Sequence, residues 1–242
     1  MNTVGSSDIG KKRVRNEDSF RFGQCEDGVV WAVVCDGMGG AKGGQTASTI
    51  AADMVGRKIE KCYNTLMTDL SIENLLLSAI TTANVAIYDR AVSDESLEGM
   101  GTTIVSCIIK NNVACIAHVG DSRAYIISDG AISQITRDHS LVQEMYDKGQ
   151  LTKEQFEHHP NKNIITRALG IEEDVDIDFD TVDVKNDDVL ILCTDGLCGC
   201  VSDQDILHTY LDCDFENLAS TYIELANNNG GRDNITVVAI KC

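Results

Sequence analysis

The chain is poor in proline, aromatic residues and positive charge. Its 242 residues include one proline and 5% aromatic residues, and 20 lysines and arginines stand against 38 acidic residues, for a net charge of -18. This balance argues against a nucleic acid as partner, because affinity for nucleic acid comes largely from lysine and arginine that neutralise phosphates. The acidic character is compatible instead with basic partners or with cations.

Long apolar segments are also missing from the sequence. We find no run long enough to span a bilayer, and the N-terminal stretch MNTVGSSDIGKKRVRNED lacks the apolar centre of a signal peptide. We therefore expect a soluble, cytoplasmic protein without a membrane segment. With 43% apolar and 24% charged residues, the composition is that of a compact folded protein. No repeat, linker or low-complexity tract marks a domain boundary.

The ten cysteines could form disulfides, bind zinc or serve as small apolar residues. Disulfides need an oxidising compartment, and the tightest group, Cys193, Cys198 and Cys200, has no fourth zinc ligand nearby in sequence. No cysteine has an arginine six positions later, the spacing that cysteine-nucleophile phosphatases use. We expect the cysteines to be reduced and mostly buried.

Strand-like and helix-like patterns occur in separate blocks. Apolar runs predict strands at 29–35, 103–109, 113–119, 123–128, 189–193 and 235–240, and periodicity predicts helices at 45–60, 73–92, 140–148, 203–211 and 215–227. The stretch ACIAHVGDSRAYIISDGAISQIT predicts consecutive antiparallel strands joined by tight turns, with a hairpin at Asp129-Gly130. Consecutive strands separated from long helix pairs indicate an α+β layered domain.

Four aspartates stand at the ends of predicted strands. Asp36, Asp121 and Asp195 follow such strands and neighbour a glycine, and Asp233 lies two residues before another strand. A single Asp-Gly pair is usually an ordinary turn. Four aspartates in this arrangement favour a site for magnesium or manganese, which prefer oxygen ligands.

The glycine-rich stretch VVCDGMGGAKGG at 33–44 does not match the common phosphate-binding loops. A dinucleotide fingerprint that begins at Gly37 needs glycine where Lys42 stands, and a P-loop needs lysine where Gln45 stands.

The sequence resembles the metal-dependent Ser/Thr protein phosphatases of type 2C in their compact bacterial form. The resemblance covers nearly the whole chain and rests on RVRNEDS at 13–19, VCDGMGG at 34–40, GMGTT at 99–103, HVGDSRAY at 118–125, TRDHSLV at 136–142, ITRALG at 165–170, LCTDGL at 192–197 and GGRDNITVV at 230–238. It implies a four-layer α-β-β-α sandwich of two antiparallel sheets flanked by helix pairs. Residues 1–242 would form one catalytic domain, usually a monomer in this family, with a flap at about 140–163 that would influence substrate choice.

The resemblance also implies which residues bind metal. Asp36 matches the carboxylate that bridges two ions, Mn²⁺ or Mg²⁺. Asp195 and Asp233 match the remaining carboxylates around one ion, and the carbonyl of Gly37 matches a ligand of the other. A glycine there would let the backbone approach a cation.

Three further acidic positions match the family pattern. Glu17 and Asp18 fall where acidic residues surround the second ion, directly or through water. Asp121, together with Asp195, matches the positions that hold a third, weaker ion in bacterial members.

The implied reaction is hydrolysis of phosphoserine or phosphothreonine on proteins, opposing a bacterial-type Ser/Thr kinase that would itself be among the partners. Two ions about 3.5–4 Å apart activate a water and stabilise the phosphoryl oxygens in such sites. Arg13, five residues before Asp18 as in the family, is the candidate that binds the phosphate, and Arg15 competes for that role.

Several neighbouring residues also bear on the chemistry of the site. Met38 replaces the histidine that eukaryotic members carry after Asp-Gly, and neither His118 nor His139 is an evident substitute as proton donor. Thr102, Thr103 and Asn234 are expected to support the site by hydrogen bonding. Asn234 would either position a water or cap the Gly230-Gly231 turn.

Two other functions remain open from the sequence. One is a catalytically inactive relative that binds phosphorylated proteins or a kinase, which the retained aspartates disfavour. The other is a metal phosphatase for a small phosphorylated metabolite or one specialised phosphoprotein.

Overall fold

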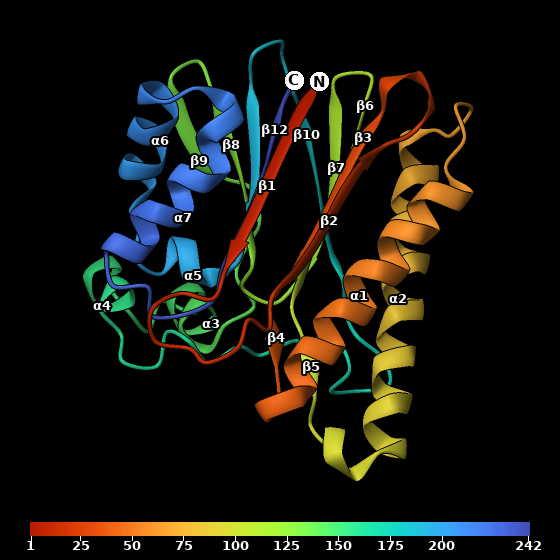
Figure 1. Ribbon diagram of the computed structural model, residues 1–242, viewed down its shortest axis with the longest axis vertical. Helices are drawn as coiled ribbons and strands as arrows, with labels where there is room; N and C mark the ends of the chain where they lie inside the picture. Colours follow the sequence, from red (N-terminus) through yellow and green to blue (C-terminus); the bar gives the residue numbers. More distant parts are fainter.

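The protein folds into two antiparallel five-stranded sheets that lie face to face, with a pair of helices outside each sheet (Figure 1). The computed structural model describes residues 1–242, except for the side chains of residues 40–42 and 157. The strand order is β1-β12-β11-β8-β9 in one sheet and β10-β7-β6-β3-β2 in the other, and β4 and β5 form a separate short pair. The predicted α-β-β-α sandwich is confirmed.

The strands are β1 (Asn2–Asp8), β2 (Ser19–Gln24), β3 (Val30–Cys35), β4 (Gly37–Met38), β5 (Gly101–Thr102), β6 (Ile104–Lys110), β7 (Val113–Val119), β8 (Arg123–Ser128), β9 (Ala131–Gln134), β10 (Asp178–Asp183), β11 (Val189–Cys193) and β12 (Ile235–Lys241). The helices are α1 (Gly40–Cys62), α2 (Asp69–Ser93), α3 (Leu141–Asp147), α4 (Lys153–Glu157), α5 (Asp195–Cys198), α6 (Asp203–Asp212) and α7 (Leu218–Asn228). Short 3-10 turns lie at Glu26–Gly28, Glu95–Leu97 and Phe215–Asn217.

The core has three apolar layers, and strand alternation explains them. In β3, Trp31 and Val33 pack among the residues beneath α1 and α2, whereas Ala32 and Val34 pack between the two sheets. A third cluster lies between the other sheet and helices α6 and α7. Because the central strands are covered on both faces, their sequences are continuously apolar, and all six predicted strands are present.

The sequence predicts that β7, β8 and β9 pair consecutively, but β7 and β8 do not pair with each other. The hairpin between β8 and β9 is present, and its two central residues, Asp129 and Gly130, both have positive φ. However, β7 pairs with β6 and β10, whereas β8 pairs with β9 and β11 in the other sheet. The turn that contains Gly120 therefore carries the chain from one sheet to the other, and Asp121 follows at the point of crossing.

Helix α2 is long and apolar enough to cross a membrane when judged by length and composition alone, contrary to the expectation that no such segment is present. Its most apolar window has a mean hydropathy of 1.4, and 44% of that window is buried in the fold. The buried side packs with α1 and with β7, in the same apolar layer as Trp31.

The cysteines are less deeply buried than expected. All ten are free thiols, but only Cys35, Cys107, Cys115 and Cys193 are buried, and Cys62 is exposed.

Candidate metal centre

The predicted ligands meet where several strands end near β4 and β5, at the end of the sheets away from the two chain termini (Figure 1). A cavity of about 580 Å³ lies there, and its walls include Arg13, Glu17, Asp36, Gly37, Asp121, Asp195 and Asp233. Met38 and Thr103 also line the cavity, and so does Asn163, which belongs to the predicted flap. Of the eight residues predicted for the site, only Asp18 does not line this cavity.

Sheet register explains how residues far apart in sequence come together. The start of β2 pairs with the end of β3, so that Ser19 lies opposite Cys35 and places Asp18 near Asp36. In the other sheet, Cys193 at the end of β11 pairs with Val237 near the start of β12. The loops that contain Asp195 and Asp233 are thereby neighbours.

The backbone around Asp36 is held by the two threonines expected to support the site. The Thr103 hydroxyl accepts a hydrogen bond from the Asp36 N–H at 3.0 Å. The Asp36 carbonyl accepts one from the Thr102 hydroxyl at 2.9 Å and one from the Thr103 N–H at 2.9 Å. These bonds fix the direction in which the Asp36 side chain leaves the end of β3.

The carboxyl groups of the site repel one another and are withdrawn from water. Burial raises the pKa of Asp36 well above its usual range, and the charges of Asp18 and Asp195 raise it further. Burial and then Asp195 raise the pKa of Asp121 to about 8. The pKa of Asp195 is raised by burial and then by Asp233. A bound cation would relieve this repulsion.

Asp18 lies behind the cavity, in the gap between the sheets. Its Oδ2 accepts hydrogen bonds from the hydroxyls of Thr194, at 3.0 Å, and Thr236, at 2.7 Å. Burial raises its pKa to about 7 despite these bonds. The Oδ1 atom of Asp18 is buried without a hydrogen-bond partner, and so is Oδ1 of Asp195. Such oxygens suit a divalent ion or its water ligands, so the residues present are compatible with the metals that the sequence predicts.

The predicted phosphate ligand Arg13 contacts an acidic residue of the site. Its Nη2 lies 2.7 Å from Oδ2 of Asp233, and this hydrogen bond is the largest cause that raises the pKa of the guanidinium. The Arg13 side chain is 49% exposed at the edge of the cavity. Arg15 lines the same cavity, so both arginines lie where a bound phosphoester can be reached.

Asn234 supports the site by hydrogen bonding, as the sequence predicts, and it does so through the segment that precedes β2. Its Oδ1 accepts the Glu17 N–H at 2.8 Å, and its Nδ2 donates to the carbonyls of Arg15, at 2.8 Å, and Ile9, at 3.0 Å. The side chain therefore fastens the segment that leads into β2 against the start of β12. It positions Glu17 and the arginine segment from behind.

Close packing of the backbone requires glycine at position 37, in addition to any approach of its carbonyl to a cation. A Cβ atom at this position would overlap the carbonyl oxygens of Gly44 and Glu17. The absence of a side chain lets the first turn of α1 and the end of the Glu17 segment pack directly on the backbone beside Asp36.

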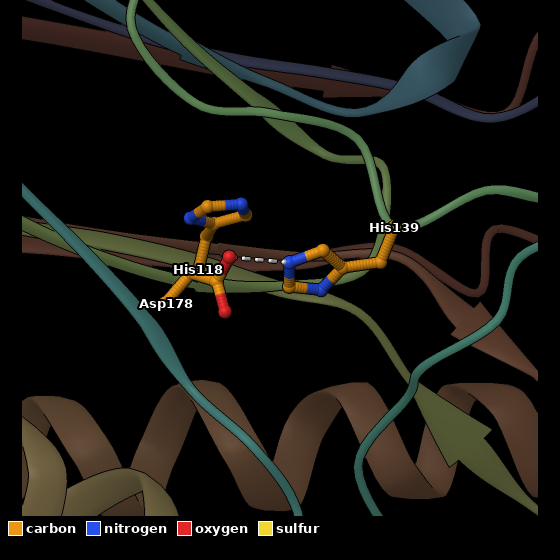
Figure 2. A group of neighbouring side chains, drawn as sticks. All are labelled: His118, His139 and Asp178. Atoms are coloured by element: carbon orange, nitrogen blue, oxygen red, sulfur yellow. Dashed lines mark ion pairs between the residues drawn. The ribbon is translucent and has the colours of Figure 1, made fainter. Parts of the chain in front are cut away.

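The two histidines considered as proton donors lie side by side, outside the lining of the described cavities. The rings of His118 and His139 stack with centroids 4.7 Å apart, and Asp178 lies beside them (Figure 2). Nδ1 of His139 accepts the Gly120 N–H at 3.1 Å, and Nε2 lies 3.2 Å from Oδ2 of Asp178. Nε2 of His118 donates to the Arg137 carbonyl at 2.9 Å.

This cluster contains three possible metal-ligand atoms within 4.8 Å, but its hydrogen bonds favour a structural role. Because Nδ1 of His139 is an acceptor, the proton of the neutral ring is on Nε2, facing Asp178. The ring then has no second lone pair for a metal. His139 instead holds the backbone immediately before Asp121, while Arg167 binds the other oxygen of Asp178 at 2.7 Å. No motif or periodicity in the sequence indicates the contact between His139 and Asp178.

Comparisons with known proteins agree with this arrangement. The family model described as protein phosphatase 2C matches residues 4–236. The serine/threonine phosphatase stp of Listeria welshimeri is 37% identical over 244 residues, covering 100% of this chain and 96% of that protein. The structure of the serine/threonine phosphatase of S. agalactiae is 34% identical, with a TM-score of 0.92 and 98% of each chain covered. The catalytic domain of the phosphatase PstP in complex with two manganese ions is 31% identical, with a TM-score of 0.85, covering 98% of this chain and 96% of that one.

Proposed function

Because this chain belongs to the protein phosphatase 2C family and is a Ser/Thr protein phosphatase, we propose that it acts through divalent ions bound by the carboxylates around Asp36. The observation that carries this proposal is the cluster of buried carboxyl groups with raised pKa values at one cavity. The manganese ions in the PstP structure support Mn²⁺, and Mg²⁺ has the same preference for oxygen ligands.

The position of each carboxylate in the cavity suggests which ion it would bind. Asp36 lies centrally, since the charges of Asp18, Asp195, Asp121 and Asp233 all affect its pKa. We assign Asp36 as the bridging ligand, with Asp195 and Asp233 on one ion. The Gly37 carbonyl and Glu17 would serve the other ion, with Asp18 behind it, and Asp121 would help to hold a third, weaker ion.

Bound ions of this kind lower the pKa of a water and offset negative charge on phosphoryl oxygens. The side chains of this protein supply the remaining requirements. The Arg13 guanidinium, now paired with Asp233, would bind two phosphate oxygens when a substrate enters. Met38 has no proton to donate to the leaving oxygen, so that proton would come from water.

The natural substrate would be a phosphorylated protein, and a Ser/Thr kinase opposed by this enzyme would be one such protein. Support comes from the relatives, which carry the names of protein phosphatases and are matched over 96% and 94% of their length. The segment 140–163 borders the cavity through Asn163 and contains α3 and α4. We propose that this flap contacts the polypeptide around the phosphorylated residue.

Phosphate release tests the proposal. Metal-stripped protein would be given Mn²⁺ or Mg²⁺ and either a phosphothreonine peptide or a small phosphorylated metabolite. We expect metal-dependent turnover of the peptide, a much lower kcat/KM for the metabolite, and loss of turnover in Asp36→Asn and Asp233→Asn. Near-normal activity of both variants would refute the assigned site. A preference for the metabolite would refute the substrate class, and no turnover with any divalent ion would favour an inactive binding protein.

A further inference from the structure

The loop between β1 and β2 concentrates positive charge in an acidic chain. Lys11, Lys12, Arg13 and Arg15 stand within five consecutive positions, and no acidic residue lies among residues 9–16. The chain as a whole has a net charge of -18. Every residue from Lys11 to Arg15 is exposed. The loop lies at the same end of the sheets as the metal centre (Figure 1).

Two basic side chains from other segments lie close to this loop. The Lys11 N–H donates to the Gly231 carbonyl at 2.7 Å, which brings the exposed Arg232 beside the loop. Burial raises the pKa of the Cys200 thiol, and the charges of both Arg232 and Lys162 oppose that rise, so both side chains lie near this thiol. The group that results is called the basic rim and consists of Lys11, Lys12, Arg232 and Lys162.

The basic rim borders the cavities around the metal centre. Arg13 and Val14, which directly follow the two lysines, line the metal cavity, and Val14 is 92% exposed. Lys162 lines a second cavity of about 340 Å³, which shares Asp121 and Asp195 with the first. In an extended polypeptide, residues two to four positions from a phosphorylated residue lie about 7–14 Å from it. A polypeptide bound at the metal centre would therefore pass within reach of the rim.

The charge of the basic rim is not neutralised by the protein itself. Asp233, next to Arg232, is paired with Arg13. Asp8, which precedes the loop, accepts hydrogen bonds from the Gly10 N–H and from an asparagine side chain. Within the part of the chain that the structure describes, no member of the rim forms an ion pair. Uncompensated charge of one sign attracts ligands of the opposite sign.

We propose that the basic rim selects phosphoprotein substrates that carry acidic side chains within about four residues of the phosphorylated one. This inference rests on the proposed phosphatase function and adds a sequence preference to it. Carboxylates of the substrate would contact the lysine and arginine charges of the rim while the phosphate occupies the metal cavity. The overall charge of -18 alone would favour basic flanks, so the rim predicts the opposite preference.

Steady-state dephosphorylation of three phosphothreonine peptides by the Mn²⁺-loaded native protein tests the inference. The peptides differ only in the residues that flank the phosphothreonine, which are glutamate, alanine or lysine. We expect a kcat/KM about tenfold higher for the glutamate peptide than for the alanine peptide, because several exposed charge pairs each contribute modestly. The lysine peptide should be the poorest substrate. Added salt should lower the ratio between the glutamate and alanine peptides, because it screens these pairs.

Charge reversal within the rim makes the test sharper. In the double variant Lys11→Glu/Lys12→Glu, the lysine peptide should become the best of the three substrates. Arg232→Glu should lower the ratio between the glutamate and alanine peptides roughly threefold. The matched control is Lys61→Glu, which changes the net charge by the same amount at an exposed position about 30 Å along α1 from the cavity. It should retain the native ratio, and circular dichroism should be unchanged in every variant.

The outcomes separate this inference from the proposed function. Turnover of none of the three peptides would refute the proposed function and the inference with it. Equal kcat/KM for all three, or a preference of the native protein for the lysine peptide, would overturn the inference alone. A fall in the ratio for Lys61→Glu equal to that for Arg232→Glu would also overturn it, because net charge rather than the rim would then set the preference.

Discussion

Asp18→Asn should stabilise the metal-free protein at neutral and alkaline pH. Oδ2 of Asp18 accepts hydrogen bonds from Thr194 and Thr236, which an asparagine Oδ1 atom can also accept. Its Oδ1 is buried without a partner, so an amide nitrogen there interrupts no existing bond. The substitution removes a negative charge that burial and the neighbouring charges of Asp195 and Asp233 make unfavourable.

The size of the effect follows from the shift in pKa. Burial raises the pKa of Asp18 from 3.8 to about 7. A carboxyl whose pKa is higher in the folded state favours folding most below its unfolded pKa, and this stabilisation is lost as pH rises through the folded value. A shift of about 3 units corresponds to a loss on the order of 4 kcal/mol between pH 4 and pH 7. The variant should gain up to this amount at pH 8 and little at pH 4.5.

Urea unfolding in the presence of a chelator measures this gain. Trp31 is the single tryptophan and is completely buried, so its fluorescence reports loss of the core. The difference between the variant and the native protein should grow from pH 4.5 to pH 8 and should shrink when Mn²⁺ is added, since the ion offsets the same charge. An equal difference at both pH values, or a less stable variant at pH 8, would refute the electrostatic explanation.

Three further substitutions test other contacts of the site. Arg13→Ala should raise the KM for a phosphopeptide roughly tenfold and leave Mn²⁺ affinity unchanged; steady-state kinetics and calorimetry would show this, and an effect confined to Arg15→Ala would mean that the other arginine binds the phosphate. Gly37→Ala should lower the free energy of unfolding by about 3 kcal/mol, because the new Cβ overlaps backbone atoms; a native urea midpoint would contradict this. His139→Ala should raise the Mn²⁺ concentration needed for half-maximal activity, whereas His139→Asn, which retains an acceptor for Gly120, should be closer to native. The exposed control His158→Ala should not change it, and equal Mn²⁺ dependence of all three would exclude a positioning role for His139.

Much of the fold could be predicted because its central strands are buried on both faces. Strands such as β3 and β11 are continuously apolar for that reason, and local sequence reveals them. The edge strands β1 and β10 are half exposed and polar, so they were missed. The helix α1 begins at Gly40, earlier than the predicted residue 45, because glycines obscure its first turn. Local pattern also could not assign β7 and β8 to different sheets.

In the site, too, features that depend on neighbouring residues could be predicted, whereas contacts between residues distant in sequence could not. Aspartates at strand ends are visible in sequence, and the sheet registers bring those strand ends together. The hydroxyls that hold Asp18 come from Thr194 and Thr236, and the pair His139 and Asp178 is separated by 39 residues. No periodicity connects these positions, because their contacts depend on how the two sheets pack.

The most direct test of the metal centre is calorimetric binding of Mn²⁺ to the metal-stripped protein and to Asp36→Asn at neutral pH. We expect at least two ions per chain in the native protein and loss of tight binding in the variant, with circular dichroism unchanged. If Asp36→Asn bound Mn²⁺ with native stoichiometry and affinity, the carboxylates around Asp36 would not be the metal centre.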